Sequence, residues 1–253
     1  MFKRFVDSVF RKPMVMSAIQ TMLASGQYQA ARDKVEELVA MAPDEGETYR
    51  IRAQIRYGLK DLDGAMTDLS QALDKDPHPS NVALCLTLRG MIQLERGEQS
   101  LALADFGRAI ATSPAHSNDA FTQRGKLHLQ MGNTTQAIED FSTALRFEIY
   151  TTAARRAELH RLRAEANLKL NDTPAAIDDL LRSRAYNPAD TRLNLQVVNM
   201  LMERGDHQMA LIVLNDALKF DPGNAEQYTA LRDKAARALG LPTSSASTGG
   251  MRS

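Results

Sequence analysis

Small and apolar residues recur along most of the chain at a spacing close to 34 residues. When the proline that closes most repeats is taken as position 32, six repeats begin at Lys12, Gly46, Ala83, Asn118, Ala157 and Thr191. Position 20 is alanine and position 24 is apolar in all six repeats, and position 15 is glycine in four of them. Self-similarity at such a period is typical of an array of equivalent structural units. The pattern predicts two antiparallel helices in each repeat, joined by a turn at position 15.

Close packing explains why certain positions stay small. Small residues at positions 8, 20 and 27 let helix backbones approach, and large side chains at positions 24 and 28 fill the remaining space. Glycine at position 15 favours a left-handed helix end, and the closing proline stops the second helix. In the fifth repeat, Thr173 is predicted to cap the second helix ahead of Pro174. One hairpin cannot bury its apolar face alone, so neighbouring hairpins must stack.

The recurrent alanines, the glycine of the turn and the closing proline resemble the tetratricopeptide repeat (TPR) family. The resemblance implies an all-α fold, a right-handed α-solenoid of helix-turn-helix hairpins. The expected repeats are 12–45, 46–82, 83–117, 118–156, 157–190 and 191–224, followed by a capping helix at 225–240 and a flexible tail at 241–253 rich in Ser, Thr and Gly. The chain departs from the family at position 4, where the usual tryptophan is absent and the last two repeats carry His160 and Asn194.

The period is interrupted twice. Three residues are added within 76–81, which contains two prolines, and five residues are added near 150–156. The prolines prevent the preceding helix from continuing, whereas the second insertion could lengthen a helix. Both insertions are open to two interpretations, simple loop variation or a change in the pitch of the array.

A pair of opposite charges also repeats in the four inner repeats. Position 7 is arginine and position 23 is aspartate, and the terminal repeats lack both. We expect structural ion pairs within or between neighbouring repeats, because the guanidinium fork can hold a carboxylate with two hydrogen bonds. The alternative is a ladder of arginines that binds anions. The expected pairs are Arg52 with Asp68, Arg89 with Asp105, Arg124 with Asp140, and Arg163 with Asp179.

Composition narrows the range of partners and compartments. The chain has 31 Lys and Arg against 31 Asp and Glu, so its formal net charge is zero, and we expect no nucleic-acid partner. RNA binding by analogy with other helical repeats is an alternative that the neutral charge disfavours. The single cysteine, Cys85, cannot form an internal disulfide and is predicted to be a core residue, so we expect a cytoplasmic protein. No apolar run is long enough to span a bilayer.

The sequence offers little catalytic chemistry. None of the five histidines belongs to a metal-binding motif. The glycine-rich motifs that bind phosphate groups, and the GxSxG motif that presents a nucleophilic serine, are also absent from the sequence. We therefore predict no catalytic residues, no metal and no cofactor, and a protein that is not an enzyme.

Binding is the expected function. The TPR resemblance implies that positions 2, 5, 9 and 12 of each first helix line a concave groove, which would hold an extended peptide or a partner helix. The family's carboxylate clamp is not predicted, because Met16 and Gln20 stand at its first-repeat positions. The candidate groove residues are Arg50, Gln54, Tyr57, Thr87, Met91, Lys126, Arg161, Glu165 and Asn199.

Residues 1–11 form a second candidate site. Phe2, Phe5, Val6, Val9 and Phe10 recur at helical spacing, with basic residues opposite. Such a basic amphipathic helix has three alternative roles: it caps the first repeat, it gives residues 1–12 weak contact with an anionic membrane surface, or it enters a neighbouring copy's groove and produces a homo-oligomer. The last two alternatives describe a membrane-peripheral or self-associating assembly factor.

Overall fold

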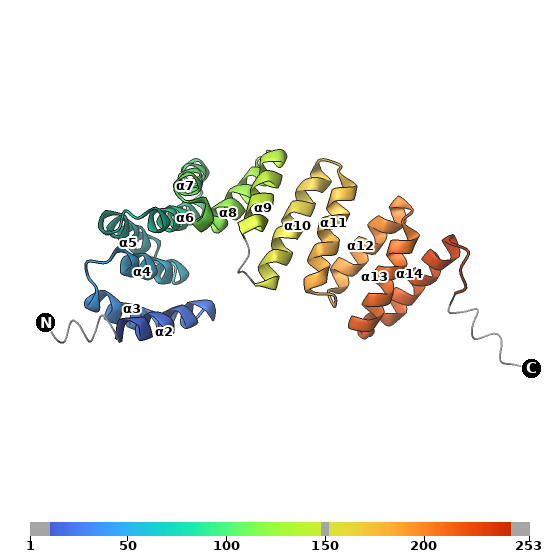
Figure 1. The fold of residues 1–253 in the computed structure, drawn as a ribbon, viewed down its shortest axis with the longest axis horizontal. Helices are drawn as coiled ribbons and strands as arrows, with labels where there is room; N and C mark the ends of the chain where they lie inside the picture. Colours follow the sequence, from blue (N-terminus) through green and yellow to red (C-terminus); the bar gives the residue numbers. More distant parts are fainter. Residues whose placement is uncertain (1–10, 148–151, 244–253) are drawn as a thin grey trace, which may run out of the picture. The chain divides into compact units, whose positions relative to one another are not determined.

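The computed structural model describes residues 11–147 and 152–243, and within these ranges all regular secondary structure is helical. The expected all-α fold is confirmed. The predicted amphipathic segment and flexible tail lie almost entirely outside the described residues. Figure 1 shows consecutive helices as adjacent pairs. The helices are α2 (Lys12–Ala24), α3 (Tyr28–Met41), α4 (Gly46–Gly58), α5 (Leu62–Lys75), α6 (Pro79–Glu95), α7 (Gln99–Thr112), α8 (Asn118–Gln130), α9 (Thr134–Phe147), α10 (Ala153–Lys169), α11 (Thr173–Tyr186), α12 (Thr191–Arg204), α13 (His207–Phe220) and α14 (Ala225–Ala238), with short 3₁₀ helices η2 (Pro114–His116) and η3 (Pro222–Asn224).

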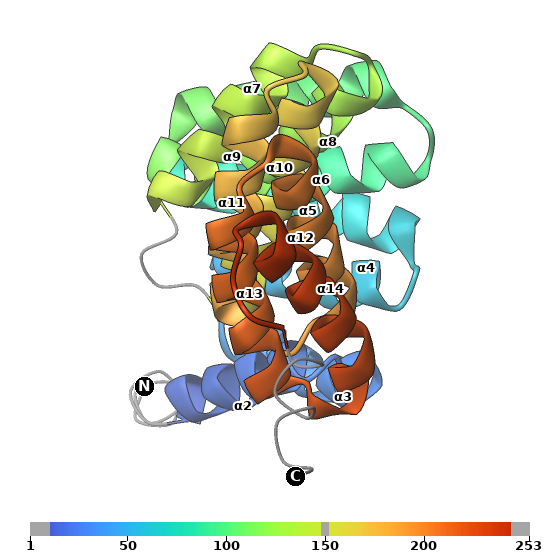
Figure 2. The ribbon, with the colours of Figure 1, turned by 90° about the vertical axis from the view of Figure 1, so that its right-hand side faces the viewer.

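The chain divides into two compact halves, an N-terminal half through Leu127 and a C-terminal half from His128. In the N-terminal half, the hairpins α2/α3, α4/α5 and α6/α7 stack through contacts of α3 with α4, α5 with α6, and α4 with α6. In the C-terminal half, α9 packs on α10, the hairpins α10/α11 and α12/α13 follow, and α14 packs on α13 (Figure 2). Each half therefore buries its apolar helix faces between successive hairpins, as the repeat pattern predicts.

The residue at position 20 is fully buried in all described hairpins. The list is Ala31, Ala65, Ala102, Ala137, Ala176 and Ala210, each with no exposed surface. Position 8 is equally tight: a Cβ added to Gly90 would lie 2.6 Å from the ring of Phe106, which is itself fully buried. A larger side chain at these positions would separate the helices, which explains the recurrence of alanine and glycine.

Every turn between paired helices passes through the left-handed conformation at position 15. Gly26, Gly97, Gly132 and Gly205 have φ between 70° and 83°, which confirms the predicted helix end. Lys60 and Asn171 occupy the same conformation, with φ of 65° and 59°. The turn geometry is therefore common to all six repeats, even where the residue is not glycine.

The two insertions extend helices. α6 and α10 each contain 17 residues, whereas the other α-helices contain 13 or 14. Pro79 occupies the first turn of α6, where its missing N–H costs nothing, and the hydroxyl of Thr152 caps α10. α6 and α10 therefore begin one turn before Ala83 and Ala157, which are the first residues of the third and fifth repeats.

The predicted cap of α11 was wrong by one residue. Asp172 is the N-cap, and its carboxylate accepts a 3.1 Å hydrogen bond from the backbone N–H of Ala175. Thr173 is the first residue of the helix. An aspartate and a threonine are both good caps, and the sequence offered both in succession.

Candidate functional site: helix-lined cavities and a buried ion-pair network

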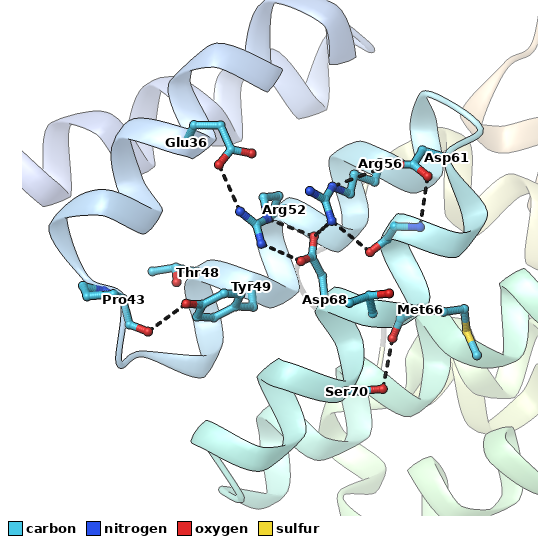
Figure 3. A network of polar contacts seen from close by, with 12 residues as sticks. Glu36, Pro43, Thr48, Tyr49, Arg52, Arg56, Asp61, Met66, Asp68 and Ser70 are labelled. Atoms are coloured by element: carbon cyan, nitrogen blue, oxygen red, sulfur yellow. Dashed lines mark hydrogen bonds and ion pairs between the residues drawn. The ribbon is translucent and has the colours of Figure 1, made fainter.

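In the N-terminal half, Arg52 and Arg89 each lie against the predicted aspartate of their own hairpin. Arg52 donates from Nε and Nη2 to the two carboxylate oxygens of Asp68 at 3.0 and 2.7 Å. Arg89 holds Asp105 in the same way at 2.6 and 2.7 Å. Figure 3 shows Arg52 between Asp68 and Glu36, with Arg56 reaching the same aspartate. The hydrogen bond to Asp68 is the main reason why the pKa of Arg52 is raised.

The C-terminal half contains a third pair with two additional partners. Arg163 donates to both oxygens of Asp179 at 2.9 and 2.6 Å. His160 Nδ1 lies 2.9 Å from Asp179 Oδ1, and Asn167 donates to Oδ2 at 3.2 Å. Burial opposes ionisation of Asp179, but the hydrogen bonds from His160 and Arg163 outweigh it and hold its pKa below the usual value.

Each of these three arginines is hydrogen-bonded to the aspartate of its own hairpin. The aspartates are almost fully buried, and the arginine side chains keep only 14–25% of their surface exposed. This geometry favours the structural interpretation over an anion-binding ladder. The fourth expected pair, Arg124 with Asp140, takes one residue from each half and stays a prediction.

A cavity of about 220 Å³ opens on the first-helix face of the N-terminal half. α4 contributes Arg50, Gln54 and Tyr57, and α6 contributes Thr87 and Met91, so five of the nine predicted groove residues meet here. The other lining residues are Tyr28, Leu84, Leu88, His116 and Asp119. The lining is thus mixed, with five aromatic or apolar residues and five polar or charged ones.

Local sequence positions the aromatic walls of this cavity. Gly58 leaves room for the ring of Tyr28, since an added Cβ would lie 2.3 Å from it. Burial raises the pKa of Tyr57, and the hydroxyl of Tyr57 is in turn the main cause of the lowered pKa of Glu95. The Thr87 hydroxyl donates to the carbonyl of Ala83 at 2.7 Å, so its polar atom is satisfied within α6.

The C-terminal half has a comparable lining along α10. Glu158, Arg161, Glu165 and Leu168 occupy the four predicted groove positions of the fifth repeat and line one cavity of about 370 Å³. A second cavity of about 500 Å³ shares Glu158 and Arg161 with it and continues toward Ala153, Tyr186 and Asp190. The spacing of three and four residues between the groove positions therefore places these side chains on one helix face.

A comparison with known protein families identifies the family of this chain. A model of the tetratricopeptide repeat matches residues 19–80, 122–190 and 162–225. The chain belongs to the tetratricopeptide repeat family. Proteins of this family generally bind other proteins and are generally non-catalytic scaffolds.

The curated relatives of this TPR chain include one protein from several vertebrates. DnaJ homolog subfamily C member 3 from Bos taurus is 26% identical over 209 residues, which cover 79% of this chain and 41% of that protein. The Homo sapiens protein is 25% identical over 209 residues, with the same coverage. The chain thus spans about two fifths of the length of these relatives.

Solved TPR structures share the fold at low sequence identity. Pseudomonas aeruginosa PilF aligns with a TM-score of 0.64 and 17% identity, covering 87% of this chain and 96% of that chain. The Cut9–Hcn1 assembly of the APC/C aligns with a TM-score of 0.63 and 18% identity, covering 91% of this chain and 44% of that chain. These similarities concern the hairpin fold alone.

Position 11 of the TPR repeat is a structural site that the sequence analysis missed. Arg56 donates to Asp68 at 2.9 Å, and Asn167 bonds Asp179, so position 11 supports the buried aspartate of position 23. A signal existed: position 11 is polar in the four inner repeats, as Arg56, Gln93, His128 and Asn167. It is Met22 and Leu201 in the terminal repeats, which also lack the Arg–Asp pair.

Two predicted groove residues lie outside these cavities. Lys126 is half-buried on α8, and Asn199 is exposed on α12.

The described residues contain no cluster of His, Cys, Asp and Glu that could hold a metal ion. Cys85 is fully buried, and burial raises its pKa to about 12. A thiol that stays protonated at neutral pH is a poor nucleophile, in agreement with a core role.

The first described residues of the TPR chain form ion pairs with its first hairpins. Arg11 donates to Glu37 at 2.5 Å, and Lys12 pairs with Glu45. The remaining residues of the predicted amphipathic segment lie outside the described ranges. Among the described helices, none has the length and hydropathy that a bilayer crossing requires.

Proposed function

We propose that this TPR protein is a non-catalytic scaffold that binds an extended peptide or a partner helix in the groove of its N-terminal half. The observation that supports the proposal is the cavity of about 220 Å³ lined by Arg50, Gln54, Tyr57, Thr87 and Met91. These residues come from corresponding positions of two successive first helices. The repeat itself therefore generates the surface.

The chemistry of the lining suits recognition of a peptide. Tyr28, Tyr57 and Met91 offer aromatic and thioether surface for an apolar side chain of the partner. Gln54 is exposed and can bond a peptide backbone, while Arg50 contributes a positive charge at the rim. The Glu47 carboxylate lies 3.5 Å from Arg50, and a pair of this length, with the Glu47 side chain 45% exposed, is weak enough for a partner's carboxylate to replace it.

Affinity capture with paired variants tests this function. The full-length Arg50→Ala/Tyr57→Ala variant is compared with the wild type and with an Arg237→Ala/Phe220→Ala control, whose residues are exposed on α14 and α13. Partners specific to the groove are expected to be lost from the first variant and retained by the control. Retention of every partner by the groove variant would exclude this face.

Residues 1–12 provide a second candidate, a membrane-peripheral or self-associating assembly role. Its support is the amphipathic pattern of the segment, with Lys3, Arg4, Arg11 and Lys12 against Asp7. The pairs of Arg11 and Lys12 with Glu37 and Glu45 favour instead a segment docked on the first hairpins. Deleting residues 1–12 and measuring liposome binding and oligomer mass separates these roles, since a simple cap leaves both values unchanged.

The lone Cys85 supports a reducing compartment such as the cytoplasm.

A further inference from the structure

The two adjoining cavities of the C-terminal half form a continuous groove beside α10. We call it the α10 groove, lined by Ala153, Glu158, Arg161, Glu165, Leu168, Tyr186, Asp190 and Gln196 together with their neighbours. Because both cavities share Glu158 and Arg161, they meet at the middle of α10. From Ala154 to Leu168 the helix axis advances about 21 Å, at 1.5 Å per residue. This length matches a partner helix of about three to four turns.

The floor of the α10 groove is apolar. In the first cavity, Leu162, Ala164, Leu168 and Leu180 contribute aliphatic surface. In the second cavity, the additional first turn of α10 brings in Ala153 and Ala154, opposite Tyr186, whose surface is 37% exposed. The inserted turn thus lengthens the binding surface by small residues that leave space for an incoming side chain.

The rim of the groove is acidic. Glu158, Glu165 and Asp190 stand against a single lining cation, Arg161. Two ion pairs at this rim are long: Arg161 lies 4.0 Å from Asp190, and Lys169 lies 3.9 Å from Glu165. Pairs of this length between exposed side chains contribute little, so a basic partner can displace them.

We propose that the α10 groove binds a basic amphipathic helix of a partner protein. The apolar stripe of such a helix covers the floor of the groove, and its lysines or arginines meet Glu158, Glu165 and Asp190 at the rim. This inference extends the proposed scaffold function, but it stands on a separate cavity with a more acidic lining than the N-terminal groove, which carries Arg50 and Asp119.

A labelled peptide provides the test. The probe is residues 1–12 of this chain, MFKRFVDSVFRK, with blocked ends, since it has five apolar residues at helical spacing and four basic residues against one acidic. Its binding to the full-length protein is measured by fluorescence anisotropy at about 20 mM and about 300 mM salt, because screening weakens exposed charge pairs. A peptide with its four basic residues changed to glutamate is the probe control.

The protein variants locate the site. Glu158→Gln/Glu165→Gln is expected to weaken peptide binding by about 3-fold or more, whereas Glu139→Gln/Glu226→Gln, the same charge change on exposed residues of α9 and α14, is expected to leave it unchanged. Circular dichroism checks that all variants fold. Absence of binding at low salt, or equal binding to both variants, overturns the proposal. If Arg50→Ala/Tyr57→Ala loses the peptide while the glutamate variants keep it, the proposal for the α10 groove is also overturned. That result would leave the proposed scaffold function intact.

Discussion

Arg184 Nε donates a 2.6 Å hydrogen bond to the side-chain oxygen of Asn194, and both side chains are buried between α11 and α12. Arg184 also donates to the carbonyl of Val213 at 3.2 Å, and Asn194 donates to the carbonyl of Pro188 at 2.9 Å. Other repeats fill these two positions mostly with apolar side chains. The polar residues at positions 28 and 4 of successive repeats therefore depend on each other.

This dependence predicts a double-mutant cycle with a large coupling energy. Arg184→Leu leaves the buried oxygen of Asn194 without its donor, so the free energy of unfolding should fall by about 1–3 kcal/mol. Adding Asn194→Leu removes the stranded polar group and should restore part of that loss. Urea denaturation of the four proteins measures the cycle. Strictly additive effects would show that the two residues act independently.

Asp179 predicts a defined dependence of stability on pH. Because His160 and Arg163 hold its pKa below the unfolded value of about 3.9, its contribution is complete above about pH 5 and is lost as the pH falls through the folded pKa. Asp179→Asn should lower stability at neutral pH and flatten this acid limb of the stability curve. The neighbouring exposed Asp178, changed to asparagine, serves as the control. An unchanged acid limb in Asp179→Asn would contradict the assignment.

Two glycines predict opposite effects of the same substitution. Gly90→Ala places a methyl group 2.6 Å from the buried ring of Phe106 and should destabilise the protein by about 1–3 kcal/mol. Gly107, inside α7, has nothing within 4 Å of the added Cβ, so Gly107→Ala should stabilise by up to about 1 kcal/mol. Thermal unfolding compares them. A neutral Gly90→Ala would show that α6 and α7 can separate without cost.

Features that recur in several or all repeats were predictable from the sequence. The hairpins, the buried alanines, the left-handed turns and the Arg–Asp positions follow from periodicity, because each repeat solves the same packing problem. Contacts made once were not predictable. Arg184 and Asn194 each depart from the repeat pattern, and nothing in either residue alone indicates the other. The cap of α11 was predicted one residue late, at Thr173 instead of Asp172, because both residue types suit an N-cap position.

The helix face that carries the cavity of the N-terminal half was predictable, but the full lining of that cavity was not. Positions 2, 5, 9 and 12 identified side chains on one helix face, and the structure places Tyr57 and Met91 around a common cavity. The contribution of Tyr28 was missed, because it reaches the cavity from a second helix through the space left by Gly58. Such a contact depends on the distance between hairpins, which periodicity does not specify.

The turns at position 15 predict a ranking at Asn171. Its φ of 59° lies in the left-handed region, where glycine is unstrained, asparagine is tolerated and alanine is disfavoured. The free energy of unfolding should therefore rise by about 0.5 kcal/mol in Asn171→Gly and fall by up to about 1 kcal/mol in Asn171→Ala. The free energy of unfolding should fall by a similar amount in Gly205→Ala. If Asn171→Ala were the most stable variant, the turn would have another backbone conformation in solution.

Site-specific photo-crosslinking tests the central claim, that the groove of the N-terminal half holds a protein partner, most directly. A photoreactive amino acid replaces Gln54, which is exposed on the groove face of α4, or Gln99, which is exposed at the start of α7, in the full-length chain. The scaffold account predicts a discrete adduct from position 54 that is lost when Arg50 and Tyr57 are changed to alanine, and no such adduct from position 99. An adduct only from position 99, or one from position 54 that survives the alanine changes, would contradict it.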